Sequence, residues 1–319
     1  MALAAQLGAV VQSTIIPKVA DNVFRSNATF ELFKYKEAVT LRGGENIRMP
    51  LTTAAAGSVG SYSPYDPLSS TPNQQLSYAT FEWRNYFGNQ PIAEVDLKKA
   101  SGDSAVIDLL MALKDNLEYS LRDTLGTHLW SDNTAGAGID IDGLRLLLST
   151  TATYGGIAVA DLATWAAQID ATAGTITLLK AERGIQAATE DSDGPDLMVS
   201  NSGIHNDIYF LMIANQRYIA GVKEQIVEIG AKHLVFDGIP YFIDRKTPGS
   251  GVSGATGQYL VFLNTRWIQL AIHEARNFEG QVFPPVANQD VYICGIKTML
   301  NLICNNRRMQ SAFTNLTNS

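Results

Sequence analysis

The stretch LTTAAAGSVGSYSPYDPLSSTPNQQLSYATF, from Leu51 to Phe81, decides the fold of this chain. Between Met49 and Glu82 the one charged side chain is Asp66, and there is little aliphatic bulk. The prolines and glycines within the stretch exclude a helix, and its tyrosines supply scattered apolar surface. Because such a segment cannot form a core of its own, we expect it to be ordered only where something covers it.

The flanks of this stretch alternate as half-buried strands do. The apolar positions on the outgoing side are Ile47, Met49 and Leu51, and those on the return side are Ala79, Phe81 and Trp83. A long, thin two-stranded hairpin is therefore predicted. An isolated hairpin is marginally stable in water, so we expect this one to lie on another subunit and to gain its burial there.

The residues of the hairpin that we predict to contact another subunit are Tyr62, Tyr65, Asp66, Leu68 and Tyr78. The alternative that the composition leaves open is a flexible linker rich in Ser and Thr. The number of tyrosines favours an interface, because aromatic side chains are enriched where proteins meet.

Composition points to assembly. The chain has 319 residues, of which 46% are hydrophobic and 17% are charged, enough for about two domains. Soluble proteins carry about 25% charged residues, so the lower value predicts a surface that meets protein. The net charge of −7 and the absence of any Lys/Arg run longer than two residues exclude a basic groove that grips phosphates. Any relation to nucleic acid is expected to be non-specific.

The N-terminus lacks the basic start and apolar core of a signal peptide, and no run approaches the roughly 20 apolar residues that span a bilayer. We therefore expect synthesis in a cytoplasm and no membrane partner. The two cysteines, Cys294 and Cys304, lie in a segment that alternates as one long strand. At about 3.3 Å per residue they would stand about 33 Å apart, which predicts two buried free thiols.

A pass along the chain gives the other elements. Residues 1–40 are expected to form an extended arm, and Gly43 and Gly44 turn the chain into the hairpin. After Pro91 the alternation predicts another strand with one wet face. A leucine repeat every three or four residues predicts a long helix over 103–130.

The second half of the chain is predicted to add an α/β unit to a first domain. A glycine-rich loop at 131–143 precedes two predicted helices, at 161–170 and 175–190. Beyond a polar boundary, residues 195–258 are expected to form a separate unit whose Asp237-Gly238 is a strong hairpin signal. Strand patterns return at 259–272 and 281–304, which suggests that the C-terminus completes the first domain.

Motifs that invite chemistry are weak. GSGVSG at 249–254 matches a dinucleotide fingerprint but is not followed by a helix. The aspartates at 132, 140 and 142 lack the spacing of a calcium loop and are read as loop solvation. The histidines stand alone, and neither a G-x-S-x-G motif nor a cysteine signature is present. We therefore predict no catalytic residue, no metal and no cofactor.

The order of parts resembles the major capsid proteins of tailed bacteriophages with the HK97 fold. The segments that carry the resemblance are GGENIRMPL (43–51), SYSPYDPL (61–68), PIAEVDL (91–97), SAVIDLLMALKDNLEYSLRDTL (104–125), PDLMVSN (195–201) and DGIPYFID (237–244). The resemblance covers essentially the whole chain. The fold that it implies is α+β, and its parts are an N-terminal arm (1–42), an extended hairpin or E-loop (43–92), a peripheral domain (93–194) with a spine helix (103–130), an inserted axial domain (195–258) and the completion of the peripheral domain (259–319).

The function that the resemblance implies is a non-enzymatic shell subunit. Such subunits form hexamers and pentamers, which close into an icosahedral virion head around double-stranded DNA, and the host bacterial cytoplasm is the expected site of synthesis. Their further partners are portal and scaffolding proteins, with decoration proteins as an option. No lysine lies between Lys36 and Lys98, so the E-loop cross-link of some members is not expected here. With barely forty residues before the hairpin, a separate scaffolding protein is the better expectation. An encapsulin-like compartment protein and a cytosolic α/β enzyme remain as alternatives.

Overall fold

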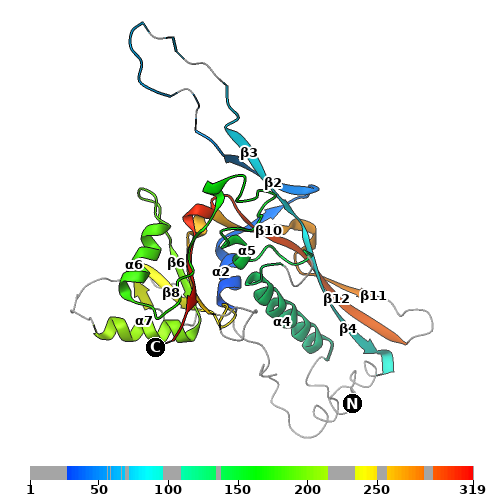
Figure 1. Ribbon diagram of the computed structural model, residues 1–319. Helices are drawn as coiled ribbons and strands as arrows, with labels where there is room; N and C mark the ends of the chain where they lie inside the picture. Colours follow the sequence, from blue (N-terminus) through cyan, green and yellow to red (C-terminus); the bar gives the residue numbers. More distant parts are fainter. Residues whose placement is uncertain are drawn as a thin grey trace.

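A computed structural model of the chain describes residues 27–55, 57, 59–65, 67–68, 72–95, 109–133, 138–214, 234–249, 257–283 and 290–318. These residues form two main β-sheets, several helices and a two-stranded hairpin that leaves the body of the molecule (Figure 1). Within the described ranges, no helix is long and apolar enough to cross a membrane.

The described α-helices are α2 (Ala28–Lys36), α4 (Leu109–Leu129), α5 (Leu144–Leu147), α6 (Leu178–Ala187) and α7 (Ser202–Ala214). The hairpin consists of β2 (Asn46–Thr52) and β3 (Leu76–Glu82). The first main sheet contains β1 (Ala38–Leu41), β4 (Arg84–Ala93), β10 (Ile268–His273), β11 (Glu279–Phe283) and β12 (Val291–Cys304). The second contains β5 (Gln168–Asp170), β6 (Leu197–Ser200), β7 (Leu234–Phe236), β8 (Ile239–Ile243), β9 (Gln258–Leu263) and β13 (Ser311–Leu316).

Strand β12 organises the five-stranded sheet. It pairs antiparallel with β4 from Val291 to Leu300, and with β10 from Leu300 to Cys304. With 14 residues, β12 is long enough to pair with β4 along its first part and with β10 along its last part. Cys294 and Cys304 both lie on it, buried and free, which confirms the prediction for the two thiols.

Helix α4 covers one face of β4 and β12 (Figure 1). Leu121, Leu125 and Leu129, spaced by four, point into the core and are buried. The helix approaches β4 closely at Gly88, where a Cβ would stand 2.8 Å from the Cδ1 atom of Leu117 and would require that side chain to shift. The described part of this helix agrees with the predicted long helix; its expected start at 103–108 lies outside the described residues.

The six-stranded sheet has the order β5-β13-β9-β6-β8-β7. The β7–β8 hairpin turns at Asp237 and Gly238, both with positive φ of 50° and 77°, as its sequence predicts. Helices α6 and α7 pack near this sheet, and Ile204 and Ile208 of α7 are buried beside it. Because β5 and β13 belong to the same sheet, the sheet extends beyond the range 195–258 on both sides.

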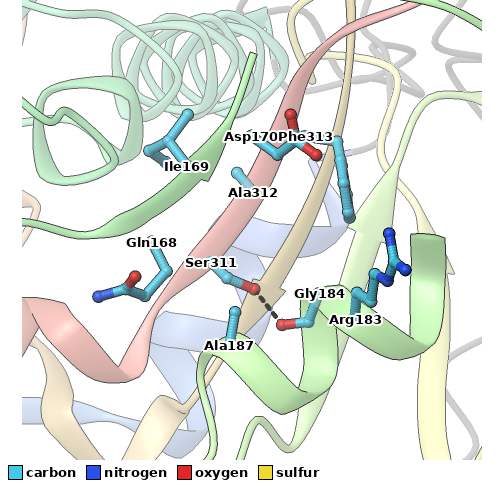
Figure 2. A pocket seen from close by; sticks show the side chains of 9 residues that line it. All are labelled: Gln168, Ile169, Asp170, Arg183, Gly184, Ala187, Ser311, Ala312 and Phe313. Atoms are coloured by element: carbon cyan, nitrogen blue, oxygen red, sulfur yellow. Dashed lines mark hydrogen bonds between the residues drawn. The ribbon is translucent and has the colours of Figure 1, made fainter. Parts of the chain in front are cut away.

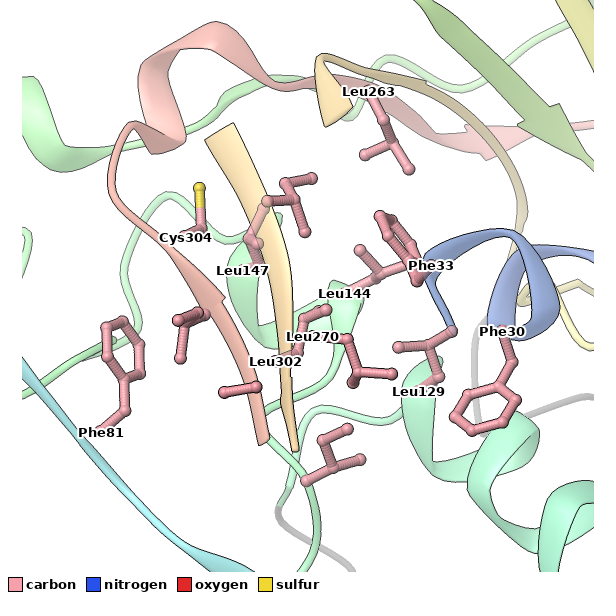
Figure 3. Close-up of a cluster of buried hydrophobic side chains, with 14 of the residues drawn as sticks. Phe30, Phe33, Phe81, Leu129, Leu144, Leu147, Leu263, Leu270, Leu302 and Cys304 are labelled. Atoms are coloured by element: carbon pink, nitrogen blue, oxygen red, sulfur yellow. The ribbon is translucent and has the colours of Figure 1, made fainter. Parts of the chain in front are cut away.

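The main core lies between the two sheets and the helices that cover them (Figure 3). Its side chains come from both ends of the described chain and from the hairpin; those labelled in Figure 3 are Phe30, Phe33, Phe81, Leu129, Leu144, Leu147, Leu263, Leu270, Leu302 and Cys304. The hairpin is therefore attached to the body through apolar contacts.

The predicted extended arm is wrong over residues 27–40. Residues 28–36 form α2, whose Phe30 and Phe33 are buried in the main core, and β1 follows as a strand parallel to β10. The helix forms because the three-residue spacing of the two phenylalanines places both on the side that packs against α4. Residues 1–26 lie outside the described part of the chain.

Two local predictions are also wrong. The strand expected over residues 93–98 is helical at 94–95, and its residues 96–98 lie outside the described residues; β4 lies earlier, at Arg84–Ala93, because the ladder with β12 sets its limits. The helix expected at 161–170 is a short 3₁₀ turn, Ala163–Trp165, followed by β5, which pairs parallel with β13. Pairing with a distant strand overrides local propensity there. The helix expected at 175–190 is confirmed as α6, whose Thr177 side chain caps it by accepting from Lys180 N at 3.2 Å.

Candidate intersubunit interface

The base of the hairpin matches the predicted alternation. Strands β2 and β3 pair antiparallel from Asn46 opposite Glu82 to Thr52 opposite Leu76. Its inner face carries the buried side chains Ile47, Leu51, Ala79 and Phe81. A one-residue shift of register would expose this whole set, so the core fixes the pairing.

The chain itself covers this inner face, which corrects the expectation that the hairpin depends wholly on another subunit. The rings of Phe81 and Tyr154 meet edge to face with centroids 5.1 Å apart. The Thr80 amide donates to the Gly155 carbonyl at 2.8 Å, so the loop at 154–157 extends the hairpin on one side. The base gains burial internally because its inner face is continuous with the main core.

Gly155 allows this close contact. Its φ is +58°, and a Cβ at this position would lie 2.9 Å from the Cβ of Ala79 and from Cζ of Phe81. A side chain would therefore both strain the backbone and push β3 away from the loop.

The tip of the hairpin, residues 53–75, is exposed wherever it is described apart from a partly covered Thr53, and extends away from the body (Figure 1). Two contacts close its lower end: Thr53 N donates to Gln75 O at 2.8 Å, and Asn73 Nδ2 donates to Ala55 O at 2.7 Å. Tyr65 is 98% exposed and Leu68 is 70% exposed. These side chains are large and apolar, and no described residue covers them.

The structure separates the predicted contact residues into two places. Tyr62, Tyr65 and Leu68 lie on the exposed tip, whereas Tyr78 lies on the outer face of the base. Asp66 lies outside the described residues. Arg48 stands over the Tyr78 ring, with its Cζ 5.1 Å from the ring centroid. The tip and the outer face of the base together are the candidate interface, and the core holds the base that carries both.

Sequence reasoning missed further exposed apolar side chains. Val59 and Leu76 belong to the hairpin, and their position in the low-charge stretch is the signal that could have found them. Phe87 projects from β4, beside the half-buried Tyr86, and the sequence gives no hint which of the two faces water. On α7, three outward side chains make a second apolar surface; they are Tyr209, Phe210 and Ile213.

One of the three loop aspartates is not solvated, contrary to the prediction. Asp142 is buried and accepts hydrogen bonds from Asn133 Nδ2 at 3.0 Å and from Asn301 Nδ2 at 2.8 Å. Arg84 forms an ion pair with it at 3.3 Å. Nothing in the local sequence separates this aspartate from its neighbours, since its partners lie far away along the chain.

Tyr86, His128 and Asp140 form a second polar group, at the C-terminal end of α4. The Tyr86 hydroxyl lies 3.0 Å from His128 Nδ1 and accepts from the Ile141 amide at 2.9 Å, while Asp140 Oδ1 lies 3.2 Å from the same ring nitrogen. Burial raises the pKa of the Tyr86 phenol well above its usual value. The phenol therefore stays protonated. His128 Nδ1 either accepts from the Tyr86 hydroxyl or donates to Asp140, according to the tautomer of the ring.

Arg307 was also missed by sequence reasoning. Its side chain is fully buried and donates to four backbone carbonyls at 2.6–3.5 Å, those of Leu146, Leu147, Ser149 and Ala152. The guanidinium also lies against two rings, 5.2 Å from the Tyr154 centroid and 5.9 Å from that of Trp165. Desolvation by burial lowers its pKa. This arginine organises the loop that also supports the hairpin.

A small pocket of about 210 Å³ lies between α6 and strands β5 and β13 (Figure 2). It is lined by Gln168, Ile169, Asp170, Arg183, Gly184, Ala187, Ser311, Ala312 and Phe313. Ser311 Oγ donates to the Gly184 carbonyl at 2.6 Å, so this hydroxyl is engaged in holding α6 to β13. Hydrogen bonds from Thr172 lower the pKa of the Asp170 carboxyl. Asp170 is the one acid in the lining, so the pocket does not offer a pair of acids.

The described histidines do not gather into a metal site. Within the described ranges, no group of three or more His, Cys, Asp or Glu could hold a metal ion. The glycine-rich segment GSGVSG lies outside the described residues except for Gly249. Glu190 forms an ion pair with Arg308 at 2.7 Å, and Asp193 accepts from Asn264 and from the Trp267 indole, so these acids have structural partners.

Comparisons of sequence find no relative: no protein-family model and no curated protein matches the chain. Comparisons of structure do. The capsid asymmetric unit of cyanophage A-1(L) matches with a TM-score of 0.72 at 14% identity, over 97% of this chain and 98% of that one. The capsid of the native GTA particle matches with a TM-score of 0.65 at 14% identity, over 99% of both chains. The holo-SrpI encapsulin complex of Synechococcus elongatus matches with a TM-score of 0.63 at 8% identity, over 99% of this chain and 96% of that one.

These matches extend over nearly the whole of each chain. They show that the chain has the fold of capsid shell proteins, which confirms at the level of fold the resemblance drawn from the sequence. The mixed α+β class agrees with it.

Proposed function

We propose that this chain, which has the fold of phage capsid proteins, is the major capsid protein of a tailed bacteriophage. Copies would assemble into hexamers and pentamers, and these into an icosahedral head around double-stranded DNA. The observation that supports the proposal most directly is the hairpin, whose base is held by the core while its tip exposes large apolar side chains. Such a tip gains burial on a second copy, and contacts between unlike surfaces of identical chains generate rings.

In this proposal each element has a role in the shell. The β2–β3 hairpin is the E-loop, α4 is the spine helix of the peripheral domain, and residues 195–258 contribute the axial domain. Tyr62, Tyr65, Asp66, Leu68 and Tyr78 contact the neighbouring copy. Because the core holds the base of the hairpin in place, only the tip residues need to become ordered when the tip contacts a neighbouring copy.

The proposed partners follow from charge and composition. A net charge of −7 without a basic run suits a container whose DNA must slide during packing, because few phosphates are gripped. The chain acts as a structural protein without a cofactor, made in the host bacterial cytoplasm and resident in the virion. Portal and scaffolding proteins, and decoration proteins where the phage has them, would complete the head.

Negative-stain electron microscopy of the purified chain and of the native particle tests this function. We expect closed, uniform shells, because an exposed apolar tip on each copy drives association until no free tips remain. Finding monomers alone in a native lysate would contradict the proposal.

A second candidate function is an encapsulin-like compartment that encloses protein. The likeness to the SrpI encapsulin complex favours it, since that match covers 99% of this chain. Nuclease treatment of intact shells separates the two functions. Protected double-stranded DNA supports a phage head, whereas shells that contain a co-purifying enzyme and no nucleic acid support the compartment.

A further inference from the structure

The hairpin continues into the five-stranded sheet through a single residue. Strand β3 ends at Glu82, β4 begins at Arg84, and Trp83 lies between them. The β4–β12 ladder ends where Arg84 pairs with Leu300, and from there β12 turns to β10. The direction in which β3 leaves the sheet is therefore decided within a few residues of Trp83.

Beyond the end of this ladder, the side chain of the next residue on β12 makes the contact with β3. Asn301, which is fully buried, donates from Nδ2 to the Glu82 carbonyl at 2.8 Å and to Asp142 Oδ2 at 2.8 Å. Its Oδ1 accepts from the amides of Asp142 at 3.0 Å and Leu302 at 2.9 Å. All four hydrogen-bonding positions of the amide are used, so its orientation is fixed.

Arg84 ties the other side of the junction to the same group. Its Nη2 lies 3.3 Å from Asp142 Oδ1, and its Nη1 donates to the Gly138 carbonyl at 2.5 Å and to Glu82 Oε2 at 3.2 Å. The side chains of Arg84 and Asp142 are only 15% and 11% exposed. A buried charge pair that is held in this way has few alternative arrangements, since each would leave a charge unpaired.

The other connection of the hairpin to the body, the one that precedes β2, is built differently. The chain enters β2 through Gly43 and Gly44, both in the positive-φ region at 138° and 115°. The Trp83 indole donates to the Gly44 carbonyl at 3.0 Å, which links this turn to the junction. Two glycines let the backbone change direction at little cost, so the direction of β2 depends on the direction that β3 takes at Trp83.

We infer that Asn301, Asp142 and Arg84 are positioning residues that fix the direction of the hairpin relative to the five-stranded sheet. They touch the junction and not the tip, so they act on a neighbouring copy only by aiming the contact residues. The importance of that direction for shells rests on the proposed function; the direction itself is a property of the single chain.

Distances between two spin labels measure this direction. One label is placed on the tip by Ser61→Cys and the other by Asn116→Cys on α4, the helix that packs on β4 and β12, both at exposed positions. The native cysteines are buried and do not compete for the label. Labelled chains are diluted into unlabelled ones, so that distances within one chain are measured in shells and in free subunits alike.

The test variant is Asn301→Leu, which removes the donors to Glu82 and Asp142 at similar size. The matched control is Gln310→Leu. Gln310 is an equally buried amide that bridges Asn264 N and O at 2.8 and 3.1 Å in the other sheet, away from the hairpin. Asp142→Asn serves as a milder variant that keeps the side-chain size but removes the charge that holds Arg84.

We expect one narrow distance peak for the parent and for Gln310→Leu, and a shifted or broadened peak for Asn301→Leu and, to a smaller extent, for Asp142→Asn. A merely structural role of Asn301 predicts a lower melting temperature with an unchanged distance, as for the control. Unchanged distances in both junction variants would overturn the inference, and Asp142→Asn decides alone should Asn301→Leu fail to fold. If the parent forms no shells, the proposed function fails, whatever the distances show.

Discussion

At the scale of single residues, Arg307 is the clearest example of a buried charged side chain that holds other parts of the interior together. Among the described residues it forms no ion pair, and backbone carbonyls and two aromatic rings take the place of a carboxylate. The carbonyls belong to the end of α5 and the loop after it, where helical carbonyls lack intrahelical partners. The same loop leads to Tyr154 and Gly155, which hold the base of the hairpin.

Replacing this arginine should be costly. We expect Arg307→Met to lower the free energy of unfolding by about 3 kcal/mol, because one buried and three partly buried carbonyls lose their donor. Urea unfolding followed by tryptophan fluorescence measures the change. Arg308→Met is the control: Arg308 is half exposed and pairs with Glu190, so its loss should change the stability by about 0.5 kcal/mol or less. Equal effects of the two substitutions would contradict the role given to the carbonyl contacts.

His205 should make stability depend on pH. The centroid of its ring lies 4.7 Å from that of Tyr241, with the two rings tilted by 37°, and the Tyr241 hydroxyl is hydrogen-bonded to Ser200 Oγ. Neither nitrogen of the His205 ring has a partner among the described residues. Burial lowers the pKa of His205 below its ordinary 6.5. The unfolded chain therefore binds the proton at a higher pH than the folded chain does, and stability falls as the pH drops below about 6.5.

Thermal melts between pH 7.5 and 5 check this prediction. We expect His205→Phe, which keeps an aromatic ring against Tyr241, to reduce the loss of melting temperature on acidification. The same pH dependence in the parent and in the variant would show that other groups cause it. His273→Phe provides the comparison, since His273 is partly exposed and its Nδ1 accepts from Ala275 N.

At the scale of elements, the hairpin divides into a held base and an exposed tip. Four buried side chains and the Gly155 loop fix the base. Beyond Thr53 and Gln75 the described contacts are few, and large apolar side chains face water. This division follows from composition, because the alternating apolar positions stop where the prolines and glycines begin.

Removal of the tip should separate folding from assembly. Deleting residues 57–73 leaves the paired strands β2 and β3 and a short loop to close them. We expect normal helix content by circular dichroism, a melting temperature within about 4 °C of the parent subunit, and no closed particles by electron microscopy. Shells formed by the deletion variant would remove the interface role of the tip.

At the scale of the whole molecule, the absence of lysine between Lys36 and Lys98 limits how copies could be joined in the proposed shell. The hairpin has apolar and backbone groups to offer, but no amine for an amide cross-link. Both cysteines are buried on β12, so a disulfide between copies is not expected either. In the proposed shell, we therefore expect burial and hydrogen bonds, without a covalent bond from the hairpin, to hold the copies together.

A denaturing gel tests this directly. Purified particles, boiled without reducing agent, should give a single band at the mass of one chain, 34.6 kDa. A ladder of higher bands that persists under reducing conditions would show a covalent bond that the hairpin sequence does not provide. Mixing with a reductant distinguishes such a bond from a disulfide.

Much of the architecture follows from local spacing. The alternation around Ile47 and Phe81, the leucine repeat of α4 and the Asp237-Gly238 turn each gave the right element, because the period of a segment is set by neighbouring residues. The exposed tip could be predicted for the same reason: it lacks the side chains from which a core is made. The boundaries of β4 and the nature of residues 161–170 could not, since distant strands decide them.

The sequence by itself thus determined a low-charge hairpin on an α+β body and the residues at its tip. The tertiary structure alone decided that the base of the hairpin is covered from within, that Asp142 is buried, and that Asn301 and Arg307 hold the junction and its supporting loop. Asp142 and Asn301 are 159 residues apart, and Arg307 is 160 residues from Leu147. Whether a polar side chain meets water or a partner depends on which strands the fold brings together, and a local pattern carries no information about that.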